Sequence, residues 1–262
     1  MATAFSRVLS TVRVEGDDVV ATVPADWMQG RSVFGGLQLA VVLAAMRTKI
    51  PNAPLRTLQT TFVAPVPAGE LRVRARILRS GKNASHVEAR IVDGENTLAL
   101  VVGVFGVARD SVVSVTPVQQ PVEEIEPFDL PFIEGVTPEF TQHFAVRWLQ
   151  GSAPFTGSRS IRSVVRVGLK DEGMATEGHV VAIADFIPPL GLSHLESVAP
   201  GSTLTWMLEF LRERFDDLPL LGWRVDAELT AASGGYTNQS VMLWGPGGEP
   251  VALSRQTMVV FG

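Results

Sequence analysis

Hydrophobic and polar positions alternate along most of the first half of the chain, with one continuous apolar interruption. The alternation over residues 11–23 surrounds the turn signal Gly16-Asp17-Asp18, which predicts a β-hairpin. From Val33 to Met46 nearly every position is apolar and Pro51 follows, which predicts a helix buried on most of its faces. Alternation then returns and predicts four strands, at residues 57–63, 71–78, 86–92 and 97–107.

The second half of the chain repeats this order. Residues 144–167 predict an extended pair, and residues 178–186 predict a second buried helix that ends before Pro188-Pro189. Similar short segments recur in both halves, namely Leu71-Arg72-Val73-Arg74-Ala75 with Trp223-Arg224-Val225-Asp226-Ala227, and Val104-Phe105-Gly106 with Val260-Phe261-Gly262. Similarity of order at a period near half the chain predicts an internal duplication.

Residues 203–212 are ambiguous when taken alone. Their pattern of apolar positions fits an amphipathic helix as well as a strand. The corresponding segment of the first half is the Thr-rich stretch that ends at Phe62, and that stretch has the composition of a strand. The repeat therefore favours a strand over residues 203–212.

The repeat divides the chain into three parts. We expect an N-terminal unit over residues 1–114, a linker rich in Pro and Glu over 115–138, and a C-terminal unit over 139–262. Each unit is predicted to be a long antiparallel sheet wrapped around one apolar helix, because a helix that is apolar all round must be covered on most sides. Pairing the two sheets edge to edge would remove an exposed edge from each. The predicted fold class is α+β.

Composition narrows the classes of function. With 46% hydrophobic and 19% charged residues, the 262-residue chain can fill a substantial core. A net charge of −5, without a dense basic segment, argues against nucleic acid as a partner. The sequence has no cysteine, so disulfides and thiolate metal sites are excluded. Residues 1–13 lack the pattern of a signal peptide and no apolar stretch could span a bilayer, so we expect a cytoplasmic protein without membrane insertion.

Several familiar chemistries lack their residues. The glycines of residues 30–36 are not followed by the Lys-Ser/Thr of a phosphate-binding loop, and the G-x-S-x-G motif of serine hydrolases does not occur. The sequence has four histidines, His86, His143, His179 and His194. Their spacing does not match that of metal ligands. We therefore expect neither a metal nor a cofactor.

The doubled order, with Phe34-Gly35-Gly36 at the start of the first helix, resembles the hot-dog fold. In its double form within one chain it resembles the TesB-like (type II) acyl-CoA thioesterases over nearly the whole length. Three segments of the second half carry this resemblance most specifically, at residues 184–188, 200–204 and 251–256. In that family an Asp, a Thr and a Gln at these places hold the water that attacks the thioester. The resemblance therefore implies Asp185, Thr203 and Gln256 as catalytic residues.

These residue types suit the implied chemistry. Asp185 follows an apolar helix, so desolvation would raise its pKa and make it a stronger base. The Thr203 hydroxyl can donate to the carboxylate, and the Gln256 amide can orient a water without adding charge. Backbone N–H groups near Gly35 and Gly36 could stabilise an oxyanion. Equally, Asp185 could serve only to end its helix, and the two glycines only to allow close packing.

The resemblance implies hydrolysis of fatty acyl-CoA to a free fatty acid and coenzyme A by direct water attack, without a covalent intermediate. We expect the acyl chain in an apolar tunnel lined by Phe62, Trp206 and Phe210. Where the family commonly has an Asp-His pair, this chain has Thr205-Trp206, which leaves chain-length preference and pocket polarity open. Candidate contacts for the coenzyme A phosphates are Arg72, Arg74 and Lys82.

Two other functions remain open on sequence grounds. One is a catalytically silent acyl-CoA-binding protein of the same fold. The other is a scaffold that uses the paired sheets for interaction with other proteins, with no affinity for acyl-CoA. Dimers and tetramers are common in the family that the chain resembles, so a homo-dimer or homo-tetramer is an optional further assembly for a doubled chain.

Overall fold

The computed structural model describes residues 2–261, so Met1 and Gly262, at the ends of the two predicted units, lie outside the described part. The first half contains these elements: α1 (Phe5–Leu9), β1 (Arg13–Glu15), β2 (Asp18–Val23), η1 (Ala25–Trp27), β3 (Met28–Gln29), β4 (Ser32–Val33), α2 (Gly35–Arg47), β5 (Leu55–Phe62), β6 (Gly69–Ser80), β7 (Ala84–Asp93) and β8 (Asn96–Gly106). The second half contains β9 (Phe128–Asp129), η2 (Glu139–His143), β10 (Phe144–Gln150), β11 (Arg162–Leu169), α3 (Glu177–Ala184), η3 (Leu190–His194), β12 (Gly201–Phe210), β13 (Trp223–Ser233), β14 (Tyr236–Trp244) and β15 (Pro250–Val260).

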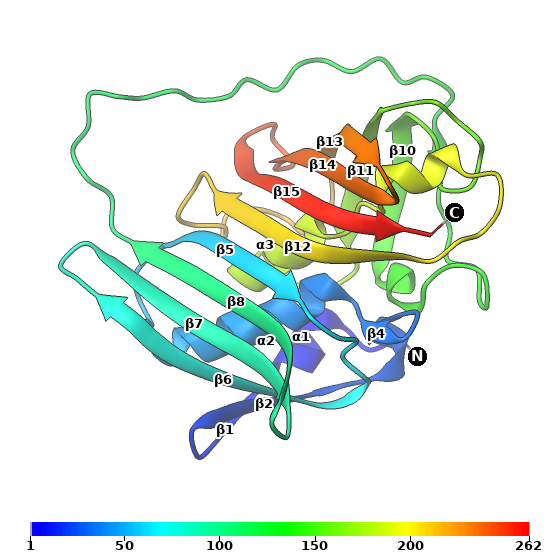
Figure 1. Cartoon of the computed structure of the whole chain (residues 1–262). Coiled ribbons are helices and arrows are strands. Elements are labelled where there is room, and N and C mark those ends of the chain that lie inside the picture. Colours follow the sequence, from blue (N-terminus) through cyan, green and yellow to red (C-terminus); the bar gives the residue numbers. More distant parts are fainter. Residues whose placement is uncertain (1, 262) are drawn as a thin grey trace.

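The long strands join into one antiparallel sheet of thirteen strands, in the order β1-β2-β6-β7-β8-β5-β12-β15-β14-β13-β11-β10-β9. The order on the two sides of the β5–β12 pair is the same, because each half places the strand after its helix at the centre and its last strand next to it (Figure 1). Leu58 of β5 lies opposite Leu208 of β12 at this junction. The predicted double hot-dog arrangement, with sheets paired edge to edge, is confirmed.

The strand assignment of residues 203–212 is also confirmed, since β12 occupies most of that segment. Its central position explains why a helix-like pattern forms a strand here. Both neighbouring strands supply hydrogen bonds along its length, and Trp206, Leu208 and Phe210 alternate onto the buried face. Tertiary pairing therefore overrides the local ambiguity.

The two apolar helices α2 and α3 pack against each other inside the curve of the sheet (Figure 1). Their contact is close because α2 carries Gly36, where an added Cβ would lie 2.8 Å from the Cα of Ala182 in α3. Thr176 caps the start of α3, with its side chain accepting from the backbone N–H of His179. The two helices are therefore in close contact at the N-terminus of α2.

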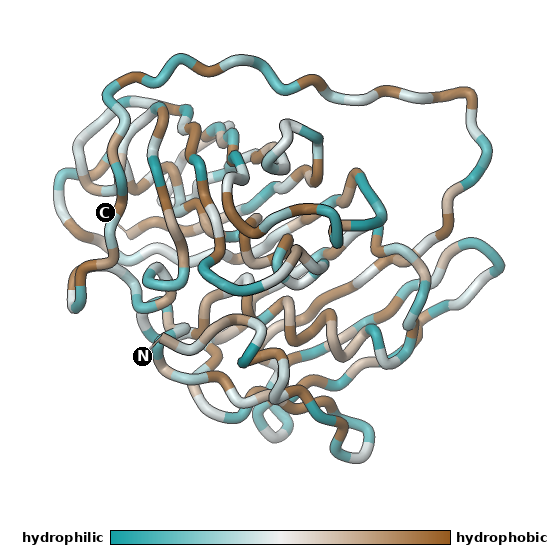
Figure 2. Tube along the Cα trace, turned by 180° about the vertical axis from the view of Figure 1, so that it is seen from behind, coloured by the Kyte–Doolittle hydropathy of each residue, from teal (hydrophilic) through white to brown (hydrophobic). Residues whose placement is uncertain are grey.

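The connection between the halves has no helix or strand from residue 107 to residue 127 and passes outside the two units (Figure 1). Figure 2 shows hydrophilic and hydrophobic residues mixed along it. Its irregular part begins before the predicted linker of 115–138, and the second half of that predicted segment contains the short strand β9, which pairs with β10. Within residues 2–261, no helix combines the length and apolar character needed to cross a bilayer.

Candidate active site

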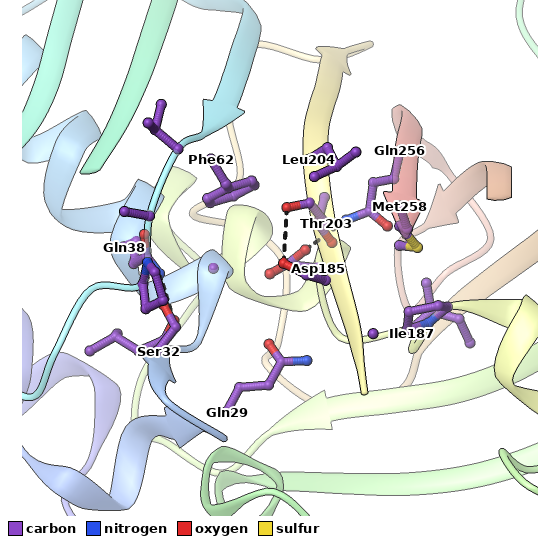
Figure 3. A pocket seen from close by; sticks show the side chains of 18 residues that line it. Gln29, Ser32, Gln38, Phe62, Asp185, Ile187, Thr203, Leu204, Gln256 and Met258 are labelled. Atoms are coloured by element: carbon purple, nitrogen blue, oxygen red, sulfur yellow. Dashed lines mark hydrogen bonds between the residues drawn. The ribbon is translucent and has the colours of Figure 1, made fainter. Parts of the chain in front are cut away.

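A pocket of about 210 Å³ opens where α2, α3 and the central strands meet, and both halves of the chain line it. Figure 3 shows Asp185 in the middle, with Ser32 and Gln38 on one side and Thr203, Leu204, Gln256 and Met258 on the other. The sequence candidates Asp185, Thr203, Gln256 and Gly35 all line it. Residues as far apart in the sequence as Gly35 and Gln256 therefore meet at one site.

Asp185 occupies the C-cap of α3, and its backbone N–H still bonds to the carbonyl of Val181 at 3.3 Å. This position places its carboxylate against the first turn of α2. A Cβ added to Gly35 would lie only 2.7 Å from Oδ2 of Asp185, so a glycine is needed for this close approach. Burial raises the pKa of Asp185 to about 7, although hydrogen bonds from the backbone of Gly36 and the side chain of Gln256 act in the opposite direction.

Gln256 binds the carboxylate directly, with its Nε2 donating to Oδ1 of Asp185 at 2.7 Å. Its own Oε1 accepts from Nε2 of Gln239 at 3.0 Å, and Oε1 of Gln239 accepts from the backbone N–H of Leu190 at 2.9 Å. Gln239 and Gln256 are each 1% exposed. Three hydrogen bonds in series therefore lead from the backbone after α3 back to the carboxylate at its end.

Gln239 was not among the predicted site residues. It lies in the alternating segment of β14, where a polar residue is usually expected to face solvent. Only the register of the sheet shows that it faces inward, directly opposite Gln256. Residues 241–244 are all apolar, so the sequence contains no alternation that would have placed Gln239 on the buried face.

Thr203 reaches the pocket through an irregularity in β12. The register with β15 shifts between Thr203 and Thr205, so that both Thr203 and Leu204 line the pocket. Bulges of this kind redirect side chains beside functional sites. Within residues 2–261, however, the Thr203 hydroxyl makes no hydrogen bond to Asp185, so the predicted donation to the carboxylate is wrong for this structure. The hydroxyl faces the same cavity and remains available to a ligand.

The two glycines of α2 have different surroundings. Gly36 packs against the backbone of α3, and its N–H donates to the Asp185 carboxylate. The N–H of Gly35, the first residue of the helix, has no hydrogen-bond acceptor within the part of the chain that the structure describes. Close packing is therefore found at Gly36, whereas the binding role of these glycines stays a prediction.

The predicted apolar tunnel is not found at this site. Phe62 lines the pocket, but Trp206 and Phe210 are 1% and 6% exposed and belong to the core. The remaining lining is mixed, since polar side chains such as Gln38, Thr203 and Gln256 lie beside apolar ones such as Val33, Leu204 and Met258. The prediction failed because alternation identifies buried side chains but does not distinguish those that line a cavity from those that fill the core.

The basic residues suggested for phosphate binding lie elsewhere. Arg72 is paired with Glu15, Asp18 and Glu70, and Arg74 is paired with Asp18. Lys82 lies in the turn between β6 and β7. None of these three basic residues lines the pocket around Asp185.

The histidines have structural surroundings. The ring of His143 stacks on Trp27 with centroids 3.9 Å apart, and its Nε2 lies 2.9 Å from the carbonyl oxygen of Asp26. His179 completes the cap of α3 through its Nδ1. Across residues 2–261, no group of three or more His, Asp or Glu side chains is placed to hold a metal ion.

Comparison with known proteins relates this geometry to a family. A model of the acyl-CoA thioesterase N-terminal domain matches residues 23–106, and one of the acyl-CoA thioesterase C-terminal domain matches residues 119–260. No curated protein matches the sequence.

Solved structures share the fold over almost the whole chain. A hot-dog protein of unknown function from Alicyclobacillus acidocaldarius has a TM-score of 0.87 at 20% identity, covering 98% of both chains. A putative thioesterase II from Thermobifida fusca has a TM-score of 0.78 at 18% identity, covering 99% of this chain and 98% of the other. The acyl-CoA thioesterase II TesB2 from Mycobacterium marinum has a TM-score of 0.74 at 15% identity, covering 98% of both.

The two domain matches follow each other in the order of the duplicated halves and together span most of the sequence. The structural similarity extends the TesB-type double hot-dog fold over the same range. This chain belongs to the acyl-CoA thioesterase family and is a thioester hydrolase.

Proposed function

We propose that Asp185 is the general base of this thioesterase and activates a water molecule for direct attack on the thioester carbonyl. The observation that carries the proposal is a carboxylate whose pKa is raised to about 7, held by a buried amide donor inside a pocket. A base with a pKa near the working pH combines a substantial ionised fraction with strong proton affinity. Such a group typically contributes about 10²–10⁴-fold to the rate.

The hydrogen bonds favour Oδ2 of Asp185 as the oxygen that accepts the proton, because Gln256 occupies Oδ1. Gln256 donates to Oδ1, and Oδ2 faces the start of α2. A water that donates to this carboxylate would transfer its proton to Asp185 while the hydroxide oxygen bonds to the carbonyl carbon. Collapse of the tetrahedral intermediate breaks the C–S bond, and the coenzyme A thiolate takes the proton back from Asp185. Water is thereby consumed, and a carboxylic acid and a free thiol are formed.

Gly35 and Thr203 supply groups for the developing oxyanion. The N–H of Gly35 lies at the positive end of α2, and the Thr203 hydroxyl faces the same pocket. One preorganised donor to an oxyanion contributes about 10²–10³-fold in well-studied enzymes. Direct attack also agrees with the inventory of the site, because the sequence has no cysteine and the pocket lining contains no histidine that could activate a serine.

The test is release of free coenzyme A thiol by the natural protein and by Asp185→Asn, with binding of a non-hydrolysable thioether analogue measured by calorimetry. We expect the variant to retain binding and to lose about 10² or more in kcat. Full activity of Asp185→Asn would contradict the assignment of the base. Binding without hydrolysis by the natural protein would instead identify a catalytically silent acyl-CoA-binding protein.

A further inference from the structure

The pocket ends at one transverse row of side chains on the buried face of the sheet. Thr60 of β5, Trp206 of β12 and Gln256 of β15 lie opposite one another in register. All three are at most 4% exposed. On one side of this row, Phe62, Leu204 and Met258 line the pocket, whereas Thr60 and Trp206 do not. The row therefore marks the inner limit of the cavity.

Trp206 is the largest member of this row and is held in place. Its indole Nε1 donates to Oγ of Ser254 at 2.8 Å. Ser254 lies opposite Leu208, one step further inward on the buried face, so the indole extends away from the pocket across the space behind Gln256. Beyond it, Leu208 and Phe210 are 0% and 6% exposed, so side chains fill the buried face of β12.

The helices α2 and α3 close another side of the pocket. At Gly36 the backbones of α2 and α3 come so near that a single added carbon would lie 2.8 Å from the Cα of Ala182. An acyl chain therefore has no passage between the helices at this point. The open side of the pocket is formed by exposed residues, namely Gln29, Val63, Ala64, Pro65, Gly201 and Ser202.

Coenzyme A is far larger than a pocket of about 210 Å³, so its pantetheine and nucleotide must extend through the open side. With the thioester carbonyl at Asp185, the acyl group then points inward, toward Trp206. Pockets for drug-sized ligands usually measure about 300–1,000 Å³, so the inner space suits only a small group.

We propose that Trp206 fills the space behind the acyl end of the pocket and thereby restricts the enzyme to short acyl groups, from acetyl to butyryl, in preference to octanoyl and longer chains. This inference rests on the proposed function of Asp185. A longer chain would have to displace the indole, break its hydrogen bond to Ser254 and separate it from well-packed neighbours. Trp206 is thus a specificity-determining residue and not a catalytic one.

The test compares kcat/KM for acetyl-, butyryl-, octanoyl- and lauroyl-CoA in the natural protein, in Trp206→Ala and in Leu208→Ala. Leu208 is the matched control because it is the next buried residue on the same face of β12. We expect the natural protein and Leu208→Ala to prefer butyryl- over octanoyl-CoA by about tenfold or more. In Trp206→Ala, the octanoyl-to-butyryl ratio should rise by about tenfold or more.

A preference of the natural protein for octanoyl or longer chains would overturn the inference while leaving the role of Asp185 intact. An octanoyl-to-butyryl ratio of kcat/KM that is unchanged in Trp206→Ala would also overturn the inference. Absence of hydrolysis with every acyl-CoA would remove the proposed function and this inference together. If Trp206→Ala does not fold, as judged by circular dichroism, Trp206→Phe replaces it in the kinetic comparison. Calorimetry with butyryl and octanoyl thioether analogues then provides a second test on the natural protein, which should bind the butyryl analogue more tightly.

Discussion

Nε2 of Gln239 donates a hydrogen bond of 3.0 Å to Oε1 of Gln256 on the neighbouring strand. Because the backbone N–H of Leu190 occupies Oε1 of Gln239, the Gln239 amide has only one satisfactory orientation. Gln256 must then present its own Nε2 to Asp185. The backbone N–H of Leu190 therefore determines, through the side chains of Gln239 and Gln256, that the Asp185 carboxylate receives a donor and not an acceptor.

Reversing this polarity should change the pH dependence of catalysis. In Gln239→Glu an acceptor replaces the donor, so Gln256 is expected to turn its amide and present Oε1 to Asp185. A carboxyl beside an acceptor favours its protonated form, which raises the pKa of Asp185 above its value of about 7. The rising limb of kcat/KM against pH should therefore move to higher pH in Gln239→Glu.

Gln239→Leu should move this limb less, because it removes the donor without supplying a competing acceptor. Ser240→Ala is the control, since Ser240 lies on the opposite face of β14 and bonds to Thr230. Identical midpoints in the natural protein, Gln239→Glu and Ser240→Ala would show that Gln239 has no influence on the protonation of Asp185.

The two glycines of α2 should respond differently to alanine. In Gly35→Ala the new Cβ would come within 2.7 Å of Oδ2 of Asp185 and 3.3 Å of Cζ of Phe62, so the carboxylate must shift. We expect kcat to fall by about tenfold or more, since small misplacements of catalytic groups are costly. In Gly36→Ala the Cβ meets the backbone of Ala182, so the expected result is a lower melting temperature.

Thermal unfolding and steady-state kinetics of both variants separate these effects. A Gly35→Ala protein with unchanged kcat would contradict the close approach of Asp185 to this helix. A Gly36→Ala protein as stable as the natural one would contradict the packing role of that glycine.

Folding stability should depend on the ionisation of Asp185. Burial raises its pKa to about 7 in the folded protein, whereas an unfolded chain releases this proton near pH 4. The folded state therefore binds more protons between these values, and the free energy of unfolding decreases as pH rises from about 4 to about 7. A pKa higher by about 3 corresponds to at most about 4 kcal/mol.

Asp185→Asn removes this cost, because an amide does not ionise. We expect its melting temperature to exceed that of the natural protein at about pH 8, with little difference at about pH 3. Asp93→Asn, at the exposed end of β7, provides the control. An Asp185→Asn variant that is less stable at the higher pH would indicate that the carboxylate is stabilising when ionised.

Much of the fold follows from periodicity and from the internal repeat. The apolar run around Leu39 and the repeat identified both helices, the alternation identified the long strands of the first half, and the repeat identified β12 correctly. The short helix α1 did not appear in the prediction. It is held by distant contacts, including donation from the Ser6 hydroxyl to Asp171, that no local pattern reveals.

The site was only partly predictable, for a physical reason. Asp185 stands out as a polar residue after an apolar helix, and Thr203 and Gln256 stand out through the family pattern; all three line one pocket. Whether a hydrogen bond forms depends on strand register and on differences in donor–acceptor distance of less than about an ångström. The donation from Gln239 and the missing contact between Thr203 and Asp185 could therefore be found only from the coordinates. The extent of the cavity beside Trp206 likewise depends on three-dimensional packing.

The most direct test of Asp185 as the general base is the dependence of kcat/KM on pH for the best acyl-CoA substrate, from about pH 5 to about pH 9. A base must lose its proton before it can accept one from water. Because burial raises the pKa of Asp185 to about 7, we expect kcat/KM to rise with pH around a midpoint of about 7 and then to level off. This limb should be absent from the residual activity of Asp185→Asn. A rate that stays constant or falls across this range in the natural protein would contradict the account.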